Sequence, residues 1–130
     1  MTLREITDAA IRLVCENPAD VATNDYTERA AYILPAFCGQ CSALDDRYRL
    51  AHAVKAKTPL SATYMEPEAT FPLTDVFIAP ATYYLAAMLV VDESEELSDR
   101  FFALYTDALA SIESALPATT EAVTDRYGLL

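Results

Sequence analysis

The sequence predicts an all-α fold: a four- to five-helix bundle with a long irregular segment or small hairpin between the second and third main helices. Three observations lead to this prediction. Apolar residues recur every three or four positions over most of the chain, which is the period of an amphipathic helix. Glycine accounts for only 2 of 130 residues, too few for the turns of an all-β domain or for a phosphate-binding loop. Hydrophobic residues make up 53% of the chain, enough to form the core of one domain.

The first helix is predicted over about residues 3–16. Thr2 and Glu5 have the spacing of a capping box, in which each side chain accepts a backbone N–H from the other residue. Apolar residues then follow at helical spacing. Pro18 ends the helix, because a proline disfavours helical backbone in the residue before it.

The second helix begins near Thr23, Asn24 and Asp25, which are good N-cap residues. It carries the most regular apolar stripe in the chain: Tyr26, Ala30, Ile33, Phe37, Cys41, Leu44 and Tyr48. Pro35 interrupts the helix, since it lacks a backbone N–H and its ring crowds the carbonyl of Ala31. Because the stripe continues past it, we expect a kink. The helix ends after Leu44 or continues through Ala53.

Residues 57–74 form the irregular insertion, with three prolines and no helical stripe. Loops of this length are uncommon in compact domains unless they have a function or are flexible. Asp75 is the expected cap of the third helix, which is apolar on nearly every side over residues 76–91 and should be the central one. Its uncharged run is too short and too polar for a membrane span, so we expect no membrane partner.

Asp92 and Glu95 again have capping-box spacing and predict the start of a fourth helix that ends before Pro117. The third and fourth helices should form an antiparallel hairpin with a short acidic turn. The helical domain thus covers residues 1–116. Residues 117–130 are expected to be a tail whose apolar end is formed by Tyr127, Leu129 and Leu130.

The formal net charge is −11, which disfavours binding to nucleic acid. Charged residues near the N-terminus indicate that no signal peptide is present, so the expected location is a cytoplasm. Four of the nine bases, however, lie together: Arg47, Arg49, Lys55 and Lys57. This basic patch is either a solvated helix face or a docking surface for an acidic partner. The acids Asp92, Glu93, Glu95, Glu96 and Asp99 are explained by the favourable placement of negative charge at a helix N-terminus.

Cys38 and Cys41 have the CxxC spacing of a redox pair, but they continue a helical stripe instead of following a strand. Packing in the core is the favoured interpretation. A zinc site would have to combine them with Cys15 and His52, which is half of a zinc signature. No catalytic set is visible, so we expect neither an enzyme nor a cofactor or metal. Eight tyrosines and no tryptophan suit surfaces that meet other proteins.

Three stretches carry a resemblance to a known family: residues 71–89 (FPLTDVFIAPATYYLAAML), 92–97 (DESEEL) and 100–109 (RFFALYTDAL). They resemble the C-terminal helical hairpin of the head-tail connector (adaptor, neck) proteins of tailed phages and prophages. The N-terminal half is similar in the order of its helices, so the likeness covers about residues 2–116. The resemblance implies a structural virion protein that docks on the portal protein, forms a ring with copies of itself and seats the next neck or tail protein. It implies a location in the virion neck, and in the bacterial cytoplasm during assembly.

For such a ring, the basic patch and the acids of the turn are candidates for a head-to-tail contact, and residues 57–74 and 117–130 for arms that order on binding. The candidate interaction residues are Arg47, Arg49, Lys55, Lys57, Asp92, Glu93, Glu95, Glu96, Tyr127, Leu129 and Leu130. The competing interpretation is a small acidic helical module or regulator that binds a basic protein. A third is a redox or zinc protein that uses Cys38 and Cys41.

Overall fold

The computed structural model describes residues 1–14, 16 and 19–117. It contains four α-helices in the described residues: α1 (Leu3–Leu13), α2 (Asn24–Ala51), α3 (Ile78–Val90) and α4 (Glu95–Ala115). Short 3-10 helices, η1 (Val21–Thr23) and η2 (Asp75–Phe77), precede α2 and α3. The same part of the chain holds no β-strand, only an isolated bridge between Thr2 and Thr70. The predicted all-α class is confirmed.

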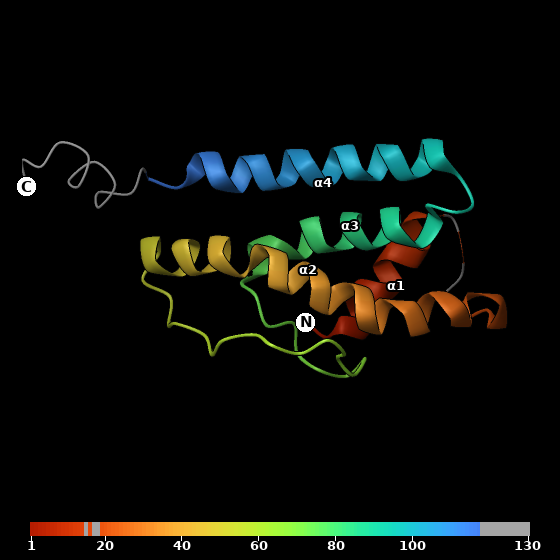
Figure 1. Ribbon diagram of the computed structural model, residues 1–130, viewed down its shortest axis with the longest axis horizontal. Helices are drawn as coiled ribbons and strands as arrows, with labels where there is room; N and C mark the ends of the chain where they lie inside the picture. The colour runs from red at the N-terminus through yellow and green to blue at the C-terminus, as the bar shows by residue number, and fades with distance from the viewer. Residues whose placement is uncertain (15, 17–18, 118–130) are drawn as a thin grey trace, which may run out of the picture.

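Helix α3 is the centre of the bundle, as predicted. It contacts each of the other three α-helices. Figure 1 shows α2 and α4 on either side of it along the long axis of the molecule, with α1 at an angle to them. Eight of its residues are buried, because small and apolar side chains cover nearly its whole circumference. Among the described residues, no helix is long and apolar enough to cross a membrane.

Helix α1 begins at the predicted capping box, with both reciprocal bonds between Thr2 and Glu5 present. It buries one face, formed by Leu3, Ile6, Thr7, Ala10 and Ile11. The helix ends at Leu13, earlier than predicted. The reason is a wider last turn, in which the N–H of Glu16 donates to the carbonyl of Ile11 at 3.1 Å, five residues back instead of four.

Helix α2 continues through Pro35 and ends at Ala51, close to the longer of the two predicted ends. Thr23 occupies its N-cap position, although its hydroxyl donates to the carbonyl of Asp20 at 2.7 Å instead of accepting from the helix. Beyond the helix, Ala53 has a φ of 54°. This left-handed backbone turns the chain back along α2.

The segment from residue 57 to residue 74, called the returning segment below, is irregular, as predicted. Its second half lies against the body and pairs with the N-terminus, and its role as a binding arm stays a prediction. The N–H of Leu3 donates to Ala69 at 3.0 Å, and the N–H of Phe71 donates to Met1 at 2.8 Å. Phe71 and Leu73 are buried in the core. These contacts replace the alternative of an internal hairpin.

Two predicted caps are wrong. The N-cap of α4 is Ser94, whose hydroxyl accepts the N–H of Leu97 at 3.2 Å, and not Asp92. The reason is that the N–H groups of Glu93 and Ser94 both donate to the carbonyl of Val90. Asp92 therefore belongs to the turn, and α4 begins only at Glu95. Similarly, Asp75 does not cap α3 but is the first residue of η2. Helix α4 ends at Ala115, before Pro117, as predicted.

Candidate functional site

The four bases of the basic patch do not form one surface. The side chains of Arg49 and Lys57 turn inward to Asp45, which is completely buried in α2. Arg49 Nε lies 2.7 Å and Lys57 Nζ 2.9 Å from Asp45 Oδ2. The other carboxylate oxygen, Oδ1, accepts the backbone N–H of Thr74 at 2.9 Å and its hydroxyl at 2.7 Å. One buried carboxylate therefore joins α2, the returning segment and the start of η2.

Further contacts complete this buried network. The Arg49 guanidinium also donates to the carbonyls of Lys55 at 2.8 Å and Pro72 at 3.0 Å. The ammonium of Lys57, only 8% exposed, also donates to the carbonyl of Ser42 and pairs with Asp46. Both bases are thus fully used inside the protein, and their role is structural.

The network determines the protonation of its members. Burial favours the neutral form of Asp45, but hydrogen bonds from Thr74, Lys57 and Arg49 outweigh it and lower the pKa of Asp45 below its usual value. Burial likewise disfavours the charge on Lys57, but the carboxylates of Asp46 and Asp45 outweigh it and raise the pKa of Lys57. The ion pair is therefore charged at neutral pH.

Arg47 and Lys55 are the remaining members of the patch. Both are exposed, and neither side chain has an ion-pair partner within residues 1–14, 16 and 19–117. Close to Lys55, a hollow of about 340 Å³ lies at the end of α2, lined by Asp46, Arg49, Leu50, Val54, Ala56 and Lys57. Leu50, which lines this hollow, is 85% exposed. This end of the molecule offers positive charge beside an apolar side chain.

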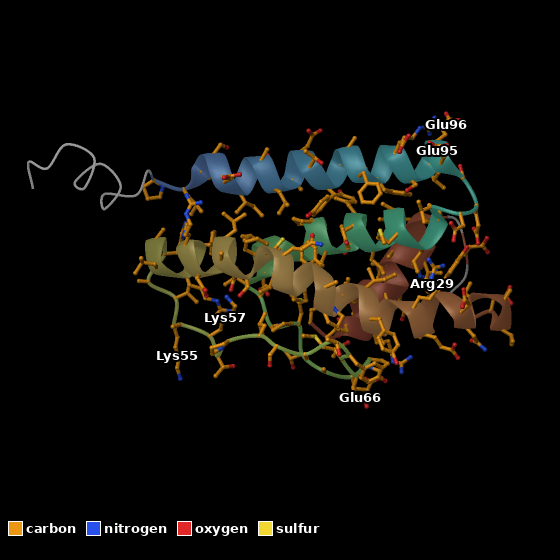
Figure 2. All side chains as sticks on the ribbon, viewed as in Figure 1. Arg29, Lys55, Lys57, Glu66, Glu95 and Glu96 are labelled. Carbon is orange, nitrogen blue, oxygen red and sulfur yellow. The ribbon has the colours of Figure 1, made fainter. Side chains whose placement is uncertain are left out.

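The acidic turn between α3 and α4 lies at the opposite end of the long axis (Figure 2). The predicted acids Asp92, Glu93, Glu95 and Glu96 are all exposed there. Glu93 accepts the Tyr26 hydroxyl at 2.6 Å, and Glu96 pairs with Arg100 at 3.1 Å. Asp92 and Glu95 have no side-chain partner in the described part of the chain other than solvent, so their charges are open to a neighbour.

Two residues of α2 fix this turn to the body. Burial raises the pKa of Tyr26 most, and the hydrogen bond to the Glu93 carboxylate adds to the shift, to about 12. The hydroxyl is therefore protonated at neutral pH and donates to Glu93. Arg29 donates to the carbonyls of Met88 at 2.9 Å and Leu89 at 3.4 Å (Figure 2). These are terminal carbonyls of α3 that have no helical partner, and a cation there is favourable. The turn is therefore held rigidly.

The cysteine pair lies inside the core. Cys38 and Cys41 are free thiols with exposed fractions of 0% and 3%. Burial raises the pKa of Cys38 to about 12 and that of Cys41 to about 11. A redox thiol needs a lowered pKa, commonly from a helix N-terminus, whereas these two lie in the middle of α2. The predicted packing role is confirmed.

The residues of the possible zinc site are not brought together in the described part of the chain, where no group of three or more candidate ligands exists. Cys15 lies outside the described residues. His52 is exposed beyond the end of α2 and stacks on Tyr48, with 4.1 Å between the ring centroids. Tyr127, Leu129 and Leu130 of the predicted tail also lie outside the described residues.

A groove of about 350 Å³, which the sequence does not predict, lies between α2 and the returning segment. It is lined by Thr27, Glu28, Ala31, Tyr32, Tyr64 and Pro67. Tyr32 and Tyr64 are two of the eight tyrosines, and nothing in their spacing predicts that their rings lie side by side. The available signal was Pro35, whose missing N–H leaves the carbonyl of Ala31 free for the returning segment.

Comparison with known proteins gives no match to this chain among family models, curated proteins or solved structures.

Proposed function

We propose that this protein is a structural component of a phage or prophage head-tail connector, which forms a ring, docks on the portal protein and seats the next neck or tail protein. The observation that carries the proposal is the placement of open charges at the two ends of the helical body. Lys55 lies just beyond the end of α2, and Glu95 lies at the turn between α3 and α4 (Figure 2). Neither side chain has an ion-pair partner among the described residues. Complementary surfaces at opposite ends of a protomer are what a head-to-tail ring contact requires.

The residues at the two ends of the body add support. The positive end combines Arg47 and Lys55 with the exposed Leu50, so a contact there would bury apolar area beside an ion pair. The acidic end is held by Tyr26 and Arg29, so it presents its carboxylates without first having to order. Residues 71–89, 92–97 and 100–109 resemble the helical hairpin of connector proteins. This resemblance is the reason for proposing that the contact forms in the neck of a phage or prophage.

The test is the oligomeric state of the purified protein, measured by native mass spectrometry and sedimentation velocity over a wide concentration range. We expect one closed oligomer of defined size that dissociates at high salt, because exposed charges at an interface are screened. Monomers at every concentration and salt level would contradict the proposal.

Charge reversals sharpen the test. Lys55→Glu and Glu95→Lys should each prevent assembly, because each places like charges opposite one another. The double variant carrying both reversals restores opposite charges at every contact and should assemble again. Asp107→Lys, at an exposed position in the middle of α4, is the matched control and should assemble like the wild type. Loss of assembly in the control as well would show that net charge alone is responsible.

The second candidate function is a small acidic helical module that regulates a basic protein. It is favoured by the packing of the returning segment, because Met65, Phe71 and Leu73 already contact the core of the single chain. These apolar side chains need no second protein to cover them. This function predicts a monomer whose state does not depend on concentration, so the same measurement separates the two candidates.

A further inference from the structure

The groove between α2 and the returning segment is built by two tyrosines that lie far apart in the sequence. The rings of Tyr32 and Tyr64 are 5.2 Å apart between centroids and inclined at 58°. Their exposed fractions are 61% and 43%, so both rings keep open faces. The two rings contact each other, and the groove lies beside this pair, where Thr27, Glu28 and the small side chain of Ala31 form its wall on α2.

The groove is formed before any ligand arrives. The N–H of Met65 donates to the carbonyl of Ala31 at 3.0 Å and holds the returning segment beside α2. On the other side of the groove, the carbonyl of Pro67 accepts the N–H of Arg4 at 2.8 Å. The two tyrosines therefore need little ordering to bind, which lowers the entropic cost of an interaction.

Negative charge surrounds these rings. Glu28 lines the groove, and Glu66, labelled in Figure 2, lies between Met65 and the lining residue Pro67 on the returning segment. Neither glutamate has an ion-pair partner in the described part of the chain, and the negative charge of Glu66 raises the pKa of the nearby Tyr64 hydroxyl.

The neighbouring bases already have partners. Arg4 pairs with Glu68 on the returning segment, and Arg29 pairs with Asp25 and donates to the end of α3. The groove is thus an aromatic site with unused negative charge.

We propose that this groove binds the side chain of an arginine presented by a partner protein. A guanidinium is planar and weakly hydrated, so it stacks on a tyrosine face more favourably than an ammonium does. Its fork of N–H donors can also reach the carboxylate of Glu28. A phosphate or a carboxylate ligand would be repelled by both glutamates. The proposal does not depend on ring formation and holds for either candidate function above.

The test uses a blocked peptide of five residues with a central arginine between glycines, titrated into the full-length protein. Tyrosine ring signals are followed by NMR. The control peptide carries citrulline, which has nearly the shape of arginine but no charge. We expect saturable shifts at Tyr32 and Tyr64 with the arginine peptide and none with citrulline.

Three variants make the result specific to the groove. Tyr32→Ala and Glu28→Gln should each weaken binding by about fivefold, the range of one cation–π contact or one charge-assisted hydrogen bond. Both positions are exposed on α2, and unchanged circular dichroism will verify that the variants fold. Glu96→Gln removes the same charge at the acidic turn and should bind like the wild type. Equal binding of citrulline, or equal weakening in the Glu28 and Glu96 variants, would overturn the proposal.

Discussion

The backbone N–H of Met65 donates to the carbonyl of Ala31 at 3.0 Å, and this bond exists because residue 35 is a proline. In an unbroken helix the carbonyl of Ala31 would accept the N–H of the residue four positions later. Pro35 has no N–H, so the carbonyl is left for a residue outside the helix. A local feature of α2 thereby determines where the long irregular segment attaches.

Pro35→Ala should release this attachment. The new N–H at position 35 competes for the carbonyl of Ala31, so we expect the amide of Met65 to exchange with solvent about tenfold faster. The amide of Phe71, which donates to Met1 in the same segment, is the internal control and should keep its protection. Hydrogen exchange followed by NMR measures both. Unchanged exchange at Met65 would show that other contacts position the segment.

The order and type of the helices could be predicted from the sequence because their signals are local. Apolar residues at helical spacing revealed all four α-helices, and the capping box at Thr2 and Glu5 located the start of α1. The same reasoning failed at the turn before α4. There Asp92 and Glu95 have the correct spacing for a capping box, but the N–H bonds to Val90 place the cap at Ser94.

The candidate surfaces could be predicted only in part, because they depend on contacts between distant residues. The pair of Asp45 and Arg49 has helical i to i+4 spacing and is readable from the sequence. Lys57 reaches the same carboxylate only because the chain reverses at Ala53, where φ is 54°. Nothing local predicts that reversal, so from the sequence alone the four neighbouring bases look like one patch. The ring contact between Tyr32 and Tyr64 is nonlocal for the same reason.

Ser94→Ala should destabilise the protein by about 1 kcal/mol, the usual value for a lost helix N-cap. The N–H of Leu97 would lose its acceptor at the start of α4. Asp92→Ala is the matched control, since Asp92 lies in the turn and caps nothing in the structure. It should change the free energy of unfolding, measured in urea, by less than half as much. A larger effect at Asp92 than at Ser94 would contradict this assignment of the cap.

The thiols of Cys38 and Cys41 should not react with a disulfide reagent in the folded protein at mildly alkaline pH. Both are buried, and their pKa values of about 12 and 11 leave almost no thiolate, the reactive form. Reaction should appear in urea, in step with unfolding. Because Cys15 lies outside the described residues, the experiment is carried out on a Cys15→Ser variant. Fast reaction of one thiol without urea would revive the redox interpretation.

Asp45→Asn should destabilise the protein by about 3 kcal/mol, as expected when one member of a buried ion pair is removed. Arg49 would lose the carboxylate that it pairs with, and Lys57 would keep only its pair with the exposed Asp46. Asp46→Asn is the matched control in the adjacent position. Asp46 is largely exposed and, among the described residues, pairs with Lys57 alone, so its loss should cost less than about 1 kcal/mol. Urea unfolding at neutral pH measures both, and equal losses would show that the buried network contributes little.

The same network predicts how stability depends on pH. The pKa of Asp45 is lower in the folded protein than its ordinary value of 3.8, so folding favours the charged carboxylate. Its contribution is therefore complete above about pH 4 and is lost as the pH falls through the lower, folded-state pKa. Other acids titrate in the same range, but they are present in both the wild type and the Asp45→Asn variant. Their contributions therefore cancel in the difference between the two proteins. The difference in unfolding free energy between wild type and this variant should thus be constant near neutral pH and shrink on acidification. A difference that stays constant to the lowest pH at which both proteins fold would mean that Asp45 is not held in its charged form by Arg49, Lys57 and Thr74.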